Sequence, residues 1–215
     1  MGKFKIQITM TLDGYVAGPN QSVKNPLGEG ADRIHDWARA TKFLRELLGS
    51  GEGGDTGIDD QVLRESFANV GATIMGRNMF GGGPGPWGDG SWKGWWGDNP
   101  PFQTPVFVLT HYAREPLVME GGTTFYFVTD GIESALKQAR RAADDKDVAL
   151  GGGANVAQQY LNAGLIDQLT LHLVPMFLGG GERLFDGIDA KKVSLEVVDL
   201  VHSPVVSHLR YEVKK

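Results

Sequence analysis

The stretch that decides the fold is Asp147-Val148-Ala149-Leu150-Gly151-Gly152-Gly153-Ala154-Asn155-Val156-Ala157-Gln158-Gln159-Tyr160-Leu161. A short apolar run meets three consecutive glycines and passes into a helical pattern, which predicts a buried strand, a turn without side chains and a helix. The unpaired N–H groups and the dipole at a helix start attract anions, and glycine lets phosphates approach the backbone closely. Taken alone, the stretch fits a nucleotide-binding turn and a plain strand-to-helix connection equally well.

The segments on either side continue the alternation of strands and helices. Apolar periodicity predicts strands at about 4–10, 72–75, 105–110, 123–129 and 169–175. It predicts helices from Asp32 as the cap to about Leu48, from a capping box at Thr56 to Phe67, and from a second box at Asp130 to Asp144. Two apolar segments, 193–201 and 205–213, predict a closing hairpin. This order indicates an α/β fold with a mostly parallel sheet, and no composition shift divides residues 1–215 into more than one domain.

Composition excludes several classes of protein. The net charge of −5 argues against a protein that tracks nucleic-acid phosphates. The absence of cysteine excludes disulfides and thiolate chemistry, and the five histidines lack zinc-site spacing, so no metal is expected. The sequence has no signal-peptide pattern and no apolar stretch of membrane-spanning length. We therefore expect a cytoplasmic protein without a membrane or nucleic-acid partner.

Residues 81–104 form a Gly/Trp-rich loop without periodicity, and they include Trp87, Trp92, Trp95 and Trp96. Disordered segments are poor in aromatic residues, so a packed loop is expected. Loops of this length commonly act as lids or binding loops. Tryptophans also anchor subunit contacts, so an oligomer interface is the alternative, and both roles are compatible.

Three predicted strands end in turns that suit an anion: Gly76-Arg77-Asn78, Thr110-His111 and Gly151-Gly152-Gly153. In an open α/β sheet, ligands bind beyond the carboxyl ends of the strands. Arg77 offers a planar fork for a phosphate, Thr110 a hydroxyl and the glycines bare amides. Taken singly, a surface salt bridge for Arg77 and a satisfied strand end for Thr110 are slightly favoured, but the recurrence of such groups at strand ends favours a dinucleotide. The chain has no P-loop or nucleophile elbow, and Val156 stands where a Rossmann fingerprint needs its third glycine.

These motifs carry a resemblance to known families. Met75-Gly76-Arg77-Asn78-Met79-Phe80, Val108-Leu109-Thr110 and Gly151-Gly152-Gly153 resemble the ordered cofactor motifs of dihydrofolate reductase. The segments 11–18 and 171–185 resemble the RibD C-terminal family, which comprises the reductase domain of riboflavin biosynthesis and its stand-alone relatives. The resemblance spans nearly the whole chain. It implies a three-layer dihydrofolate-reductase-like fold, with about eight strands, helices on both faces and NADPH across the carboxyl edge.

The resemblance also implies roles for particular residues. NADPH would be held by Thr9, Val16, Ala17, Gly76, Arg77, Asn78, Met79, Thr110, His111, Gly151, Gly152, Gly153, Ala154, Asn155 and Val156. On the substrate side, Asp36 is the first candidate for proton donor or anchor and Asp13 the second. The alternatives are a surface carboxylate for Asp36 and a turn-forming residue for Asp13. Trp37, Trp87 and Trp95 are expected to line the substrate space.

The implied activity is transfer of a hydride from NADPH to a small heterocyclic or ribosyl substrate. Leu150 stands where the riboflavin enzymes place a glutamate that grips their pyrimidine, so a ribosylaminopyrimidine substrate is in doubt. A homodimer is expected from the resemblance. Two alternatives stay open: a nucleotide-binding member of the fold without turnover, and a dimeric interaction protein whose tryptophans serve subunit contact alone.

Overall fold

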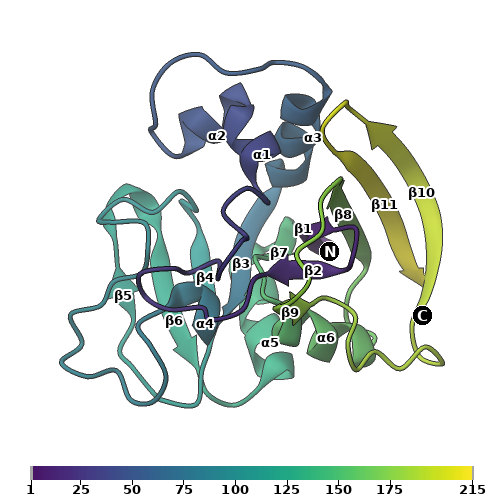
Figure 1. Cartoon of the computed structure of the whole chain (residues 1–215). Coiled ribbons are helices and arrows are strands. Elements are labelled where there is room, and N and C mark those ends of the chain that lie inside the picture. Colours follow the sequence, from purple (N-terminus) through teal and green to yellow (C-terminus); the bar gives the residue numbers. More distant parts are fainter. Residues whose placement is uncertain (1, 215) are drawn as a thin grey trace.

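The computed structural model describes residues 2–214, so Met1 and Lys215 lie outside the described chain. Its centre is a nine-stranded sheet in the order β10-β11-β8-β1-β7-β3-β4-β6-β5 (Figure 1). The strands are β1 (Phe4–Thr11), β3 (Val70–Gly76), β4 (Pro105–Leu109), β5 (Leu117–Val118), β6 (Thr124–Val128), β7 (Asp147–Leu150), β8 (Gln168–Val174), β10 (Ser194–His202) and β11 (Ser207–Lys214). The six central strands are parallel, and β11, β10 and β5 are antiparallel additions at the two edges.

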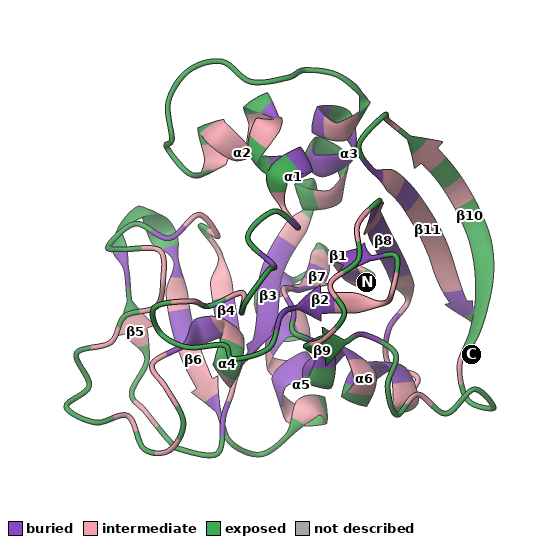
Figure 2. Cartoon of the chain, viewed as in Figure 1, coloured by how far each residue is buried: buried purple, intermediate pink, exposed green. Residues whose placement is uncertain are grey.

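Helices cover both faces of this sheet. The helices are α1 (Asp36–Ala40), α2 (Lys42–Leu47), α3 (Ile58–Phe67), α4 (Arg77–Phe80), α5 (Ile132–Ala143) and α6 (Ala154–Asn162), with a 3-10 turn at Glu120–Gly122. In Figure 1, α1, α2 and α3 lie above the sheet, while α5 and α6 lie below it. The central strands are buried and the outer strand β10 is exposed (Figure 2). Among the described residues, no helix is both long enough and apolar enough to cross a bilayer.

The expected α/β fold, with its mostly parallel sheet and closing hairpin, is confirmed, although the sheet has nine strands instead of about eight. The strand β5 was not predicted. The same is true of β2 (Tyr15–Ala17) and β9 (Glu182–Arg183), which pair in a separate two-stranded sheet. These strands hold two or three residues each. Such short strands carry too little alternation to be recognised from sequence.

The single helix predicted from Asp32 to about Leu48 is wrong, because the chain breaks at Thr41 into α1 and α2. Thr41 adopts an extended conformation, and its Oγ1 accepts a hydrogen bond from the Leu44 amide, which caps α2. The same hydroxyl donates to the Ala38 carbonyl at the end of α1. Asp32 does not cap α1, whose N-cap is His35. A threonine between two apolar helical turns is thus the signal that marks the break.

The two predicted capping boxes are also wrong. The N-caps of α3 and α5 are Gly57 and Gly131, and neither helix has a side-chain cap. The Asp130 carboxylate instead accepts a hydrogen bond from the Ser134 hydroxyl. Phe67, an apolar residue at the end of α3, is exposed and contacts Phe43. Helix-start motifs therefore located these helices correctly but misplaced the capping group.

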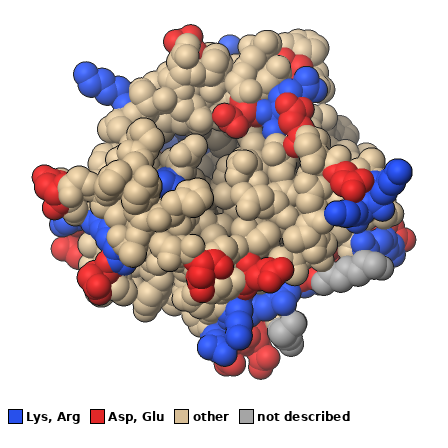
Figure 3. Space-filling view, turned by 90° about the horizontal axis from the view of Figure 1, so that it is seen from below, with Lys and Arg blue, Asp and Glu red and all other residues tan. Residues whose placement is uncertain are grey.

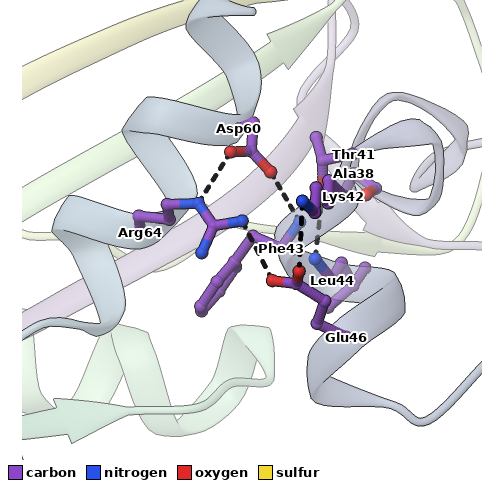
Figure 4. A network of polar contacts seen from close by, with 8 residues as sticks. All are labelled: Ala38, Thr41, Lys42, Phe43, Leu44, Glu46, Asp60 and Arg64. Carbon is purple, nitrogen blue, oxygen red and sulfur yellow. Dashed lines mark hydrogen bonds and ion pairs between the residues drawn. The ribbon is translucent and has the colours of Figure 1, made fainter. Parts of the chain in front are cut away.

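A polar network joins α2 to α3 above the sheet (Figure 4). The buried Asp60 carboxylate accepts hydrogen bonds from the Phe43 amide at 2.5 Å and from Arg64 Nε at 2.7 Å. Arg64 also donates to Glu46 at 3.0 Å. Burial raises the pKa of Asp60, but the hydrogen bonds from Arg64 and Phe43 outweigh it and leave the pKa lowered. Asp60 is therefore a carboxylate that fixes the helical layer over the sheet.

Candidate functional site

The glycine turn after β7 and the Gly76 turn after β3 lie side by side at the carboxyl edge of the sheet. The Gly76 amide donates a hydrogen bond to the Gly152 carbonyl at 3.2 Å, and the Gly151 amide donates to the Ile74 carbonyl at 2.8 Å. A side chain on Gly76 would place its Cβ only 2.8 Å from Val156 Cγ2. Two motifs far apart in sequence thus form one continuous backbone surface, which the dinucleotide hypothesis requires.

The start of α6 is suited to an anion. Its N-cap is Gly153, and within residues 2–214 no side chain caps it, so its first amides stay available. A Cβ on Gly153 would meet nothing within 4 Å, which leaves open space over these amides. Seen from below, the molecule is hollowed near its middle, and charged side chains gather mainly around the rim (Figure 3). Exposed amides and an open approach are what a phosphate needs.

Arg77 lies at the same edge, but most of its guanidinium is already engaged. Its Nε donates to the Gly81 carbonyl at 3.1 Å and its Nη2 to the Gly83 carbonyl at 3.0 Å. The guanidinium carbon lies 3.2 Å from the centroid of the Trp87 ring. Among the described residues, Nη1 is buried without a partner. The predicted planar fork for a phosphate is therefore reduced to this single nitrogen.

The Gly/Trp-rich loop is fastened to the body by a second arginine that sequence reasoning missed. Arg114 donates to the Trp92 carbonyl at 2.8 Å and to the Gly90 carbonyl at 2.7 Å. Its guanidinium also lies over the Trp87 ring, whose Nε1 donates to the Tyr112 carbonyl. The loop is packed, with three tryptophans against the Phe80 and Phe125 cluster. The contact of Arg114 spans more than twenty residues, and no local pattern could have revealed it.

The remaining predicted cofactor residues surround this edge unevenly. The buried Thr110 hydroxyl accepts a hydrogen bond from the Tyr112 amide, so it is a satisfied strand end. Met79 contacts the glycine turn, because a Cβ on Gly151 would lie 3.2 Å from its Cε. The side chains His111, Asn78 and Asn155 are exposed. The His111 side chain has no hydrogen bond within the described chain and is free to meet a ligand.

On the other side of the glycine turn, β1 and β2 hold three predicted residues, and Trp37 contacts one of them. Val16 and Ala17 are buried in β2, which lies against β1. Trp37 reaches down from α1 and its Nε1 donates to the buried Thr9 Oγ1 at 3.3 Å. Trp95 lies elsewhere, 4.8 Å from the Trp92 ring within the loop. Of the three tryptophans expected to line the substrate space, Trp37 therefore lies beside β1, whereas Trp87 and Trp95 lie within the Gly/Trp-rich loop.

Both carboxylates proposed as proton donors have structural contacts. Asp13 accepts hydrogen bonds from the Thr11 hydroxyl and from the amides of Leu178 and Gly179. Burial raises its pKa, but these hydrogen bonds outweigh it and lower the pKa. Asp36 is exposed and forms ion pairs with Arg33 and Arg39. These contacts favour the turn-forming interpretation of Asp13 and the surface interpretation of Asp36.

Comparison with known proteins agrees with this architecture. Residues 3–208 match the family model of the RibD C-terminal domain. The chain is 26% identical over 200 residues to the uncharacterised protein YyaP of Bacillus subtilis (strain 168), covering 90% of this chain and 85% of YyaP. The Shewanella sp. PV-4 protein named for riboflavin biosynthesis matches with a TM-score of 0.63 at 20% identity over 99% of each chain. Dihydrofolate reductase from Enterococcus faecalis, solved with NADP(H), matches with a TM-score of 0.55 at 15% identity over 100% of this chain and 98% of that one.

Proposed function

The chain belongs to the RibD C-terminal domain family, and from this premise we propose that it is an NADPH-dependent reductase. The substrate would be a small pteridine-like, pyrimidine-like or ribosyl compound with a reducible C=N or C=O bond. The observation that carries the proposal is the Gly76–Gly152 hydrogen bond, because it joins two separate glycine turns into one backbone surface next to the uncapped start of α6.

The residues present fit a phosphorylated dinucleotide. The α6 amides and the open space at Gly153 would receive the pyrophosphate. Nη1 of Arg77 and the exposed His111 would meet the adenosine-side phosphate. The buried Thr9, Val16 and Ala17 would border the nicotinamide at the end of β1. A buried, unpaired guanidinium N–H is unfavourable unless a ligand satisfies it, and a phosphate oxygen would do so.

When bound, the reduced nicotinamide supplies the hydride, and the chain's own side chains set orientation and exclude water. Trp37 forms an apolar wall over the end of β1 that would hold a flat ring in place. Leu150 is fully buried at the end of β7 and cannot grip a polar pyrimidine edge. We therefore propose a flat substrate bound mainly by stacking and shape.

The test combines binding and turnover. Purified protein should show saturable tryptophan quenching by NADPH, and candidate pteridines and pyrimidines should cause loss of the reduced nicotinamide absorbance. Arg77→Ala should weaken the binding of NADPH much more than the binding of NADH. The matched variant Arg114→Ala, which also releases the loop, should change the affinity for both cofactors equally. An equal loss of affinity for NADPH and NADH in Arg77→Ala would show that Arg77 does not bind the 2′-phosphate. Binding without turnover on any substrate would favour a nucleotide-binding member that lacks catalysis.

We also propose that the protein forms a homodimer through the outer hairpin. The outer strand β10 exposes apolar side chains, with Val197 at 65% and Leu200 at 62% of their full accessibility. An exposed edge strand of this kind is a template for pairing with a second copy. Sedimentation of Val197→Lys against the native protein tests this: the variant should be monomeric, and an unchanged sedimentation coefficient would rule out this surface.

A further inference from the structure

The face of the sheet beneath α3 is polar, although α3 lies over it (Figure 1). A sheet face that a helix covers is normally apolar. Here Gln7 of β1 lies opposite Thr170 of β8, which lies opposite Arg210 of β11. Opposed residues and residues two apart project to the same face, so Lys5 and Gln168, which also oppose each other, extend this polar surface towards the amino ends of β1 and β8.

Towards the carboxyl ends, the same face continues with a row formed by Thr9, His172 and His208. The two imidazoles are 2.8 Å apart at their Nδ1 atoms, and His208 Nε2 lies 2.9 Å from Asp59 Oδ1. The Trp37 ring packs 4.7 Å from the His172 ring and 5.1 Å from the His208 ring. This second row is therefore covered by α1 and contacts the helical layer directly.

The first row lies beside a cavity of about 90 Å³, between the end of α3 and the sheet. Ser66 of α3 lines the cavity from one side, and Gln7, Gln168 and Thr170 line it from the sheet. A drug-sized pocket has at least about 300 Å³, whereas one water needs only about 10–15 Å³. The cavity therefore has room for several waters or for one molecule of a few non-hydrogen atoms.

The neutral polar side chains at this cavity lack partners. Within residues 2–214, the side chains of Gln7, Ser66, Gln168 and Thr170 form no hydrogen bond. The Gln7 Oε1 atom is also fully buried. A buried acceptor without a partner is unfavourable, and each such group in a folded protein requires an explanation. An occupant of the cavity that donates a hydrogen bond would supply the missing partner.

The charges at the cavity favour a neutral occupant. Lys5 Nζ lies 3.0 Å from Asp147 Oδ2 and also donates to the Ala68 carbonyl. The Nη2 atom of Arg210 lies 3.3 Å from Glu65 Oε2. Each cation thus already has a carboxylate partner. An anion would have to displace one of these carboxylates, whereas a neutral molecule needs only the unpaired amides and hydroxyls.

We propose that the cavity under α3 is a second binding site, separate from the cofactor edge, for a small neutral amide or urea-type molecule. An amide N–H group would donate to Gln7 Oε1, and an amide carbonyl would accept from the Thr170 hydroxyl or the Gln168 side chain. This inference is independent of the proposed reductase function. It accounts for a polar sheet face that the packing of α3 does not need.

NMR of the glutamine side-chain amides tests the site without any catalytic readout. Acetamide is the probe, and acetate, which has the same shape but a charge and no N–H donor, is the matched control. The Gln7 and Gln168 resonances should shift along one saturable curve with acetamide, with a dissociation constant on the order of millimolar because so small a ligand makes few contacts. Acetate should bind at least about tenfold more weakly, because it leaves the Gln7 acceptor unpaired.

A shift that does not saturate with acetamide, or equal affinity for acetate, would overturn the proposal. A crystal soaked in acetamide that holds only water in the cavity would overturn it as well.

Variants locate the contact. Gln7→Leu should abolish the acetamide-dependent shift of Gln168, and it should fold, because exchanging an unpaired buried amide for an apolar group of similar size is nearly neutral or stabilising. Thr170→Val, a second variant in the same cavity, should weaken acetamide binding about tenfold through the loss of one hydrogen bond. Gln61→Leu, at an exposed position of α3, should leave the affinity unchanged. Native affinity for acetamide in Gln7→Leu or in Thr170→Val would place the probe elsewhere and overturn the proposal.

Discussion

The contact between Gly76 and Val156 gives a quantitative prediction about the junction of the two motifs. In Gly76→Ala the new Cβ would lie 2.8 Å from Val156 Cγ2, although carbon atoms prefer about 3.5–4.0 Å. Val156 cannot turn away, because a β-branched residue in a helix has one strongly preferred rotamer. The backbone angles of Gly76, φ −78° and ψ 160°, are open to alanine, so the only penalty is steric.

Two opposing effects set the expected size. Overpacking costs about 1–3 kcal/mol. Replacing glycine at an unstrained position returns about 0.4–1 kcal/mol through the unfolded state. We expect Gly76→Ala to lower the free energy of unfolding by about 1–2 kcal/mol, since the steric cost exceeds the entropic gain. It should also weaken the binding of NADPH, because α6, which carries Val156, must shift away from residue 76.

A double-mutant cycle isolates the contact. Val156→Ala alone should cost about 2 kcal/mol for its buried methyl groups. It should also make room for the alanine at position 76, so the double variant should lose at least about 1 kcal/mol less than the sum of the single losses. Urea unfolding measures each term, and Gly180→Ala, whose Cβ meets nothing within 4 Å, is the matched neutral control. Additive losses within about 0.5 kcal/mol would refute the proposed contact.

Other predictions concern the helical layer and the loop. Asp60→Asn should lower the free energy of unfolding by about 2 kcal/mol at neutral pH, because a charge-assisted hydrogen bond is lost in a buried setting. Because the pKa of Asp60 is lowered in the folded protein, its contribution to stability is complete above the unfolded pKa, about 3.9, and is lost as the pH falls through the folded pKa. The stability of the variant should therefore fall less steeply with decreasing pH than that of the native protein. Equally steep falls would exclude Asp60 as the source. Arg114→Ala should make residues 81–104 susceptible to limited proteolysis. The control Lys93→Ala, which removes an exposed ion pair in the same loop, should not. Equal cleavage rates in the two variants would show that Arg114 does not fasten the loop.

Sequence reasoning succeeded where short-range patterns carry the information. A glycine after an apolar strand indicated the turn at 76, and a run of three indicated the turn at 151–153; the parallel sheet then brings both to one edge. It failed where the deciding contact is distant. Arg114 reaches the loop across more than twenty residues, and the row of Thr9, His172 and His208 exists only through the register of three strands. Thr41 was a local signal that was outweighed by the apolar periodicity around it.

Roles in catalysis were the least predictable part. A carboxylate on a helix resembles a catalytic acid in sequence, but Asp36 is balanced by two exposed arginines and Asp13 by backbone amides. Only the folded chain shows that the buried titratable groups near Trp37 are imidazoles. Burial and hydrogen-bond partners determine such roles, and neither can be read from residue type alone.

The central claim is that separate strand ends hold one reduced dinucleotide. Titration of the isotopically labelled protein with NADPH, followed by backbone amide NMR, tests it directly. We expect the amides of 76–79, 110–111 and 151–156 to shift together along one saturable curve, with NADH binding more weakly at the same amides. Absence of saturable binding, or shifts confined to only one of these three segments, would contradict it.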